Sequence, residues 1–258
     1  MKIGAVNNFR NDISDEIRLV ASESFGFIDL TLEPVSDKSL DTADVKKALE
    51  DTGIEIIGHT SVFLPVVFPL ESVRCAAMDE MTRYVDFFSD IGARCMSVHP
   101  SGSIPIIDHN ELIKANREFI SAMAGMCKRK KMTLMLETVM TPFNTPEIFR
   151  VLLEGMDEVM VHLDVGHCNV NSQRDLAEEF FDEFGERIRH IHFSDNCGEN
   201  DDHLPLGKGS VDWRAVMKIL SRYGYDGTIT LEIFSEDRRL LLESKKYLED
   251  IIAGERQL

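Results

Sequence analysis

Metal-binding side chains stand at the ends of apolar, strand-like runs throughout this sequence. The runs IEIIGHTS, CMSVHPSG, LMLET, VMVHLDVGH, HIHFSDN and TITLEIF carry, in order, His59, His99, Glu137, Asp164 with His167, His192 and Glu232. Residues so far apart in sequence can share one site only where parallel strands lie side by side and end at the same face. This pattern predicts a parallel β/α barrel, whose active site lies at the C-terminal ends of its strands.

Four of these residues, Glu137, Asp164, His192 and Glu232, stand at the ends of the strands predicted in the last four runs. Two glutamates, an aspartate and a histidine form a mixed oxygen and nitrogen cage that suits Mn²⁺, Co²⁺, Fe²⁺, Zn²⁺ or Mg²⁺. Without a cation, gathered carboxylates repel one another and some take up protons. Taken alone, Glu232 has a structural interpretation as a strand-end carboxylate, and His192 as a hydrogen-bonded interior histidine. Their repetition at strand ends favours a metal site, for which we expect one ion and at most three.

Eight short apolar runs alternate with longer segments of helical periodicity. The runs are centred near Ile3, Ile28, Ile56, Met96, Leu134, Val161, Ile191 and Ile229. Between them, segments such as 72–92 and 110–131 carry apolar residues three and four positions apart, as amphipathic helices do. Helix starts are indicated by Thr145-Pro146, Ser172 and Asp212.

Length and composition agree with one such domain. A chain of 258 residues with 43% hydrophobic content is the usual size of a single barrel and can fill one large core. We therefore predict an α/β fold, a single (β/α)8 TIM barrel over residues 1–258.

The overall charge restricts the partners of the protein. A net charge of -17 disfavours nucleic acid and anionic membranes. The five cysteines are odd in number and form no C-x-x-C pattern, which argues against a disulfide framework. The N-terminus opens with a strand, and no run of 18 apolar residues follows. These features predict a cytoplasmic protein with no membrane partner.

Several of the motifs resemble a known group. The segments LET at 136–138, HLDVGH at 162–167, HIHFSD at 190–195 and HLPLGKGSVDW at 203–213 resemble the xylose isomerase-like barrel superfamily. That superfamily contains sugar isomerases and epimerases together with endonuclease IV. The resemblance implies that Glu137 and Glu232 act both as acid/base pair and as metal ligands, that Asp164 and His192 complete the metal sphere, and that His167 contacts the substrate.

The same superfamily suggests a second interpretation, a zinc phosphodiesterase or AP endonuclease with a multinuclear site. Endonuclease IV binds three zinc ions with nine ligands, and each has a counterpart in this chain. The counterparts are His59, His99, Glu137, Asp164, His167, His192, Asp201, His203 and Glu232. A DNA-repair nuclease also needs basic loops that grip phosphates. The loop 199–205 is acidic instead, and the basic run 128–131 is predicted at the opposite end of the barrel.

Other residues admit two roles. His59, His99 and His203 fit either substrate hydrogen bonding or extra metal ions, and Asp201 competes with its neighbour Asp202 for the role of site acid. Lys208 is a candidate for binding a substrate carboxylate or phosphate.

One departure from the family pattern bears on the substrate. The loop SDNCGENDDH, residues 194–203, lacks the arginine that many ketose 3-epimerases carry there. A sugar, a sugar acid or an inosose therefore stays open as the substrate of a divalent-metal-dependent isomerase or epimerase.

The apolar segment 61–72 follows the third predicted strand. It is too apolar for an ordinary exposed loop, which indicates a lid or a contact in a homo-oligomer.

Overall fold

A computed structural model of the protein describes residues 1–34, 42–102 and 105–255. Its eight strands are parallel neighbours in chain order and close into a barrel, with β8 paired to β1. The strands are β1 (Lys2–Val6), β2 (Phe27–Leu32), β3 (Glu55–Thr60), β4 (Cys95–Val98), β5 (Thr133–Glu137), β6 (Met160–Asp164), β7 (Ile188–Phe193) and β8 (Thr228–Leu231). The prediction of a single TIM barrel is confirmed, and each predicted run forms a strand.

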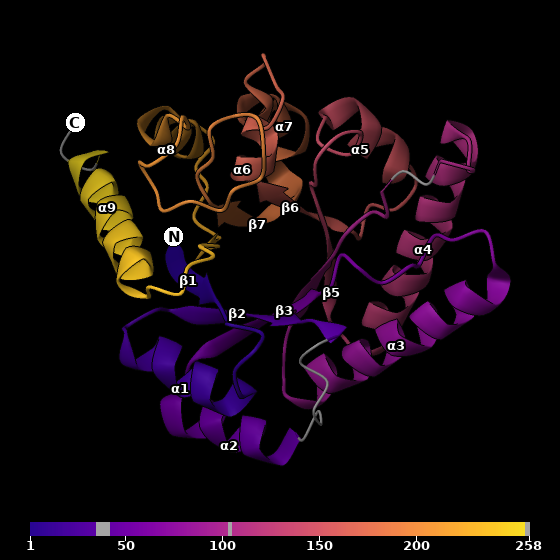
Figure 1. Ribbon diagram of the computed structural model, residues 1–258, viewed down its shortest axis with the longest axis horizontal. Coiled ribbons are helices and arrows are strands. Elements are labelled where there is room, and N and C mark those ends of the chain that lie inside the picture. Colours follow the sequence, from indigo (N-terminus) through magenta and orange to yellow (C-terminus); the bar gives the residue numbers. More distant parts are fainter. Residues whose placement is uncertain (35–41, 103–104, 256–258) are drawn as a thin grey trace.

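Helices surround the barrel as an outer ring (Figure 1). They are α1 (Ile13–Ser22), α2 (Thr42–Thr52), α3 (Glu71–Asp90), α4 (His109–Arg129), α5 (Pro146–Leu152), α6 (Val165–Asn169), α7 (Leu176–Phe184), the 3-10 turn η2 (Gly185–Arg187), α8 (Trp213–Arg222) and α9 (Arg239–Glu255). Within the described part of the chain, none of them is both long and apolar enough to cross a membrane.

Helix starts follow local side-chain chemistry. Asp212 caps α8 by accepting hydrogen bonds from the first backbone N–H groups, and Thr145 with Pro146 opens α5, as predicted. The prediction for Ser172 is wrong, because α7 is capped three residues later by Asp175. Ser172 instead forms a local turn with Arg174.

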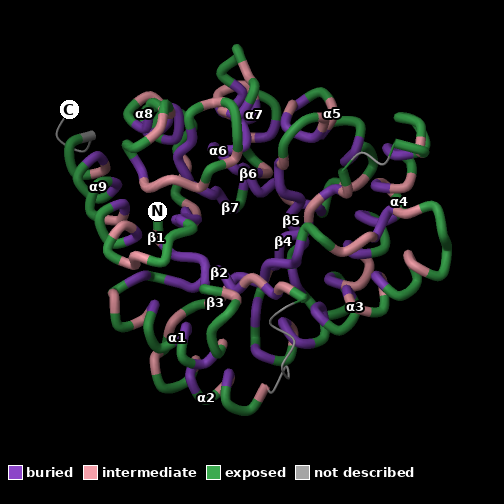
Figure 2. The backbone as a smooth tube through the Cα atoms, viewed as in Figure 1, coloured by how far each residue is buried: buried purple, intermediate pink, exposed green. Residues whose placement is uncertain are grey.

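Alternation along each strand separates two cores. Outward side chains pack against the helices in one large apolar core, so burial is concentrated in the strands and inner helix faces (Figure 2). Inside the barrel, a small apolar cluster is formed by Phe27, Ile57 and Met135. Gly4 makes this possible, since a Cβ there would lie 2.4 Å from the Phe27 ring. On the three strands that carry this cluster, the next inward residues are the buried ionisable side chains of Asp29, His59 and Glu137.

The structure describes both the basic run 128–131 and the apolar segment 61–72. The basic run 128–131 lies at the C-terminal end of α4, before β5 begins, and so at the end of the barrel opposite the strand C-termini. In the apolar segment 61–72, Val66 and Val67 are buried in the core, whereas Phe63 and Leu70 are exposed. Its predicted role as a lid or oligomer contact stays a prediction.

Candidate metal centre and active site

The four predicted metal ligands converge at the C-terminal mouth of the barrel. Glu137 and Asp164 are the last residues of β5 and β6, His192 lies in β7, and Glu232 directly follows β8. All four are buried, and one ligand atom from each lies within 4.8 Å of the others. The barrel topology therefore brings together residues that are up to 95 positions apart, from Glu137 to Glu232.

The contacts within this group have the form of a cation site. His192 Nδ1 lies 3.0 Å from Glu232 Oε2 and 3.8 Å from both Glu137 Oε1 and Asp164 Oδ2. Asp164 Oδ2 is buried yet makes no hydrogen bond. Buried oxygens normally have a partner, so an unpartnered carboxylate oxygen that faces an imidazole nitrogen fits a divalent cation with oxygen and nitrogen ligands.

A second group lies beside the first and shares Glu137 with it. The Nε2 atoms of His59 and His99 are 3.0 Å apart, and they lie 2.8 Å and 3.0 Å from Glu137 Oε2. Because Glu137 offers one oxygen to each group, its carboxylate can bridge them.

A third group comes from loops. Asp201 Oδ2 lies 3.1 Å from His167 Nε2 and 2.9 Å from His203 Nε2. Its neighbour Asp202 is exposed, so Asp201 is the acid that contacts the predicted site residues. His203 has a φ of 46°, an uncommon backbone conformation for a non-glycine residue. Its imidazole ring packs against the Phe234 ring, with the two ring centroids 4.2 Å apart.

Lys208 differs from the other predicted residues. It is exposed on the loop before α8. Among the described residues, no hydrogen bond or ion pair joins its ammonium group to the three groups. Its role in binding a substrate anion stays a prediction.

Burial and crowding shift the protonation of the site. Burial raises the pKa of Asp164 to about 7. Burial would also raise the pKa of Glu137, but the imidazoles of His162, His99 and His59 hold it well below its usual range. Burial opposes a charge on His59, yet Glu137 and Asp29 outweigh it and raise the pKa of His59 to about 10. The carboxylates thus attract positive charge into the mouth of the barrel, as protons on imidazoles or as a metal ion.

Comparison with known proteins places this geometry in a family. The family model for the xylose isomerase-like TIM barrel matches residues 17–252. The chain belongs to the xylose isomerase-like TIM barrel family. The resemblance inferred from the sequence motifs is therefore confirmed.

Individual relatives are distant. The uncharacterized protein MJ1311 of Methanocaldococcus jannaschii is 25% identical over 218 residues, which cover 77% of this chain and 73% of that protein. Fructoselysine 3-epimerase of Shigella flexneri is 23% identical over 170 residues, 63% of this chain and 60% of the enzyme. The crystal structure of a D-tagatose 3-epimerase-like protein superposes with a TM-score of 0.87 at 22% identity and covers 100% of both chains.

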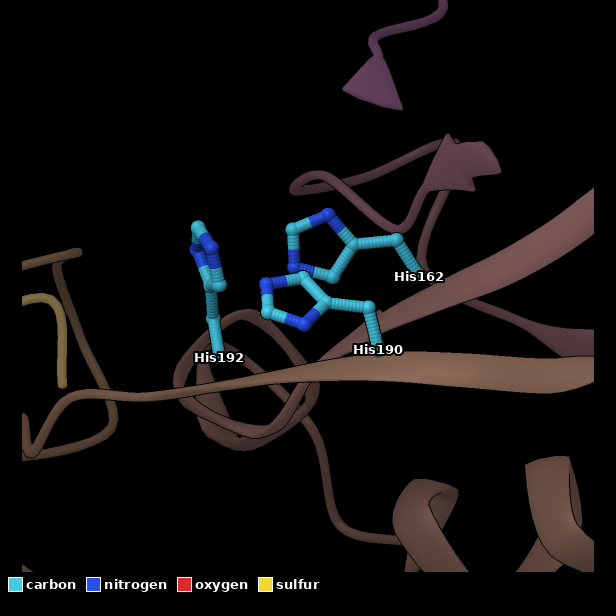
Figure 3. A group of neighbouring side chains, drawn as sticks. All are labelled: His162, His190 and His192. Atoms are coloured by element: carbon cyan, nitrogen blue, oxygen red, sulfur yellow. The ribbon is translucent and has the colours of Figure 1, made fainter. Parts of the chain in front are cut away.

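This member of the family also carries buried polar residues that the strand-end pattern missed. Asp29, His162 and His190 are fully buried inside the barrel. His162 from β6 and His190 and His192 from β7 project toward one another (Figure 3). A signal for two of them was present in the sequence, because alternate residues of a strand point to the same face. His162 precedes Asp164 by two positions and His190 precedes His192 by two, so each histidine shares the inner face with a predicted ligand.

The loop that carries Asp201 and His203 is organised by one buried acid. Asp195 Oδ2 accepts hydrogen bonds from Trp213 Nε1 at 3.0 Å and from the backbone N–H of Gly207 at 2.8 Å. Asp195 also pairs with Leu204 in a backbone bridge. The loop is thereby tied to the end of β7, which positions Asp201 and His203 over the mouth.

Proposed function

We propose that the protein is a divalent-metal-dependent isomerase or epimerase of a small carbohydrate. The observation that carries the proposal is the convergence of Glu137 and Glu232 with Asp164 and His192 in one buried group. The 3-epimerase named among the relatives acts, by its name, on a carbohydrate derivative, which supports the same reaction class for this chain.

The metal ligands in this proposal are Glu137, Asp164, His192 and Glu232. Their donor set and the unpartnered Asp164 Oδ2 fit a hard or borderline divalent ion such as Mn²⁺, Co²⁺, Zn²⁺ or Mg²⁺. Such an ion, when bound, polarises substrate carbonyl and hydroxyl oxygens and makes a neighbouring C–H more acidic.

The two glutamates supply proton transfer. One glutamate, as a carboxylate, accepts the proton from the carbon beside the carbonyl, and the other glutamate, in its protonated form, donates a proton to the enediolate and becomes a carboxylate. Return to the opposite face of the same carbon gives an epimer, and return to the neighbouring carbon gives an isomer.

The histidines of the other two groups orient the substrate in this proposal. His59, His99, His167 and His203 offer ring nitrogens around the mouth, where they can hydrogen-bond sugar hydroxyls. The loop 194–203 contains no arginine, which favours a sugar, sugar acid or inosose over the substrates of arginine-bearing ketose 3-epimerases.

A second candidate is a multinuclear zinc phosphodiesterase. The observation that favours it is the gathering of all nine candidate ligands into three adjacent groups, with Glu137 common to two of them. Clustered metal ions activate water and neutralise charge in phosphodiester hydrolysis. The net charge of -17 and the acidic loop 199–205 weigh against a nucleic-acid substrate.

One paired experiment tests the proposal. Metal per chain is measured by elemental analysis on protein purified without chelator or affinity metal, and hydrogen exchange from solvent into ketoses, sugar acids and inososes is followed by NMR in D₂O. We expect one ion per chain and exchange at the carbon beside a carbonyl. Two or three zinc ions with cleavage of a phosphodiester and no exchange would support the second candidate. A chain with no bound metal and no exchange would contradict both.

A further inference from the structure

A buried carboxylate lies beneath the proposed metal centre. Asp29, in the middle of β2, has an exposure of 0%. Its Oδ2 lies 2.7 Å from His192 Nε2, 2.9 Å from His190 Nε2 and 3.0 Å from Thr230 Oγ1. Its Oδ1 faces His59 Nδ1 at 3.5 Å. One acid therefore contacts a residue from each of two donor groups at the mouth.

These contacts determine which ring nitrogens carry hydrogen. A carboxylate oxygen accepts hydrogen bonds, and Asp29 Oδ2 has the Nε2 atoms of His190 and His192 and the hydroxyl of Thr230 within 3.0 Å, all of which can donate. The Nε2 of His192 must therefore donate to Asp29. Its Nδ1 is then the nitrogen that faces Glu232 Oε2 at 3.0 Å, Glu137 and Asp164.

On the other side of the barrel, His59 Nδ1 lies 3.5 Å from Asp29 Oδ1, with no hydrogen bond between the two atoms. With Nδ1 of His59 directed at Asp29, its Nε2 is the atom that faces Glu137 Oε2 and His99 Nε2. Asp29 thus stands behind both histidines, on the side away from the carboxylates of the mouth.

We infer that Asp29 is a positioning residue that fixes the orientation and tautomer of His192 for metal binding; this inference rests on the proposed function. A carboxylate behind a metal-bound histidine typically changes metal affinity by about 10- to 100-fold when it is removed. The sequence of β2 alone does not reveal this role, because Asp29 is the strand's one ionisable residue and its partners lie on other strands.

The cluster of His162, His190 and His192 is explained by the same network. His190 and His192 direct Nε2 at Asp29, and His162 Nδ1 lies 2.9 Å from Ser97 Oγ. Three imidazoles therefore gather here around hydrogen-bond partners inside the barrel, below the proposed metal ligands.

The first test compares two substitutions at the same carboxylate. Asp29→Asn keeps the shape but puts an amide where the acceptor stood, and Thr230→Val removes another donor to Oδ2 without touching a metal ligand. Cobalt affinity of the metal-free full chain is measured by chelator competition, with the visible Co²⁺ bands as the signal. We expect Asp29→Asn to weaken binding about 10- to 100-fold and Thr230→Val by less than about threefold.

Two results would overturn the role of Asp29. Unchanged cobalt affinity in Asp29→Asn would show that Asp29 does not position His192. Equal weakening in both variants would show that any change in the buried network lowers cobalt affinity, whether or not it touches Asp29. A wild-type chain that binds no cobalt would contradict the proposed metal centre itself and the inference with it. Unchanged affinity in the variant, with normal binding by the wild type, would contradict only the inference.

A second measurement needs no variant, in case Asp29→Asn does not fold. In the zinc-loaded wild type, labelled with ¹⁵N-histidine, long-range ¹H–¹⁵N spectra distinguish the two ring nitrogens. We expect His192 to bind zinc through Nδ1 and to keep hydrogen on Nε2. Zinc on Nε2 of His192 would show that Asp29 does not set its tautomer.

Discussion

The two faces of each strand in this barrel have opposite chemistry. On β6, Val161 and Leu163 point outward into the apolar core, whereas His162 and Asp164 are in contact with the other ionisable residues inside the barrel. Barrel interiors are commonly filled by layers of bulky apolar side chains. Here that filling is limited to the cluster around Phe27, and the mouth is left to ionisable residues.

The outward faces of the strands therefore stabilise the fold, and the inward faces carry the residues of the proposed site. Burying a polar group costs free energy unless it is paired, whereas each buried apolar side chain contributes roughly 1.5–3 kcal/mol. The outer core can therefore stabilise the closed barrel while the inner face holds carboxylates and imidazoles in one place. Substitutions on the two faces should consequently have different effects, on stability for one and on activity for the other.

The largest expected effect is on the inner face. Glu232→Gln removes a proton acceptor and a metal ligand while it keeps the side-chain shape, and a positioned acid or base alone contributes about 10²- to 10⁴-fold to rate. We expect loss of more than about 10³-fold in solvent hydrogen exchange, with the free energy of unfolding little changed. NMR exchange rates and urea unfolding measure the two effects.

The matched control is Glu236→Gln. It makes the same chemical change four residues along on an exposed position, and we expect unchanged exchange. Full turnover by Glu232→Gln would rule out the mechanism with two glutamates.

Strand ends could be predicted well from the sequence, for a physical reason. A parallel strand is buried on both faces, so it appears as a short apolar run, and the side chain that follows it must lie at the mouth. Glu137 and Glu232 were identified in this way, and the structure brings them together.

The remaining site features depended on information that the pattern lacks. Because both faces of β2 are buried, its apolar run does not indicate which alternate residues face inward, and Asp29 was overlooked. Asp201 and Asp202 are adjacent in an irregular loop, so only the folded backbone shows which one contacts the histidines. The prediction of a helix start at Ser172 failed similarly, because Asp175, three residues later, is an equally good capping residue.

A smaller effect, on stability, is expected on the outer face. Leu163→Ala empties a fully buried position next to Asp164 in sequence but on the other side of the strand. We expect a loss of about 2–5 kcal/mol in unfolding free energy, with activity per folded molecule retained. Leu242→Ala, at a partly exposed position of α9, serves as control and should cost well under half as much. Loss of activity at full stability in Leu163→Ala would contradict the separation of the two faces.

The smallest effect concerns pH and the metal-free protein. Burial raises the pKa of Asp164 to about 7, whereas an unfolded aspartate titrates near 4. The unfolded chain therefore releases this proton first as pH rises, and the folded protein loses stability between about pH 4 and pH 7. Asp164→Asn removes that loss and keeps an oxygen to accept the backbone N–H of His167, which lies 2.8 Å from Asp164 Oδ1.

We expect the free energy of unfolding of metal-free Asp164→Asn, relative to that of the wild type, to increase by on the order of 2 kcal/mol as pH rises from 5 to 8. Urea unfolding in the presence of chelator measures this difference. Asp201→Asn is the control of opposite sign. Burial would raise the pKa of Asp201, but hydrogen bonds from His167 and His203 hold it below its usual range, so its contribution is present throughout that interval. This control should lose stability at both pH values. An equal response of the two variants to pH would show that Asp164 is not held protonated by burial, and that the mouth tolerates its negative charge without a cation.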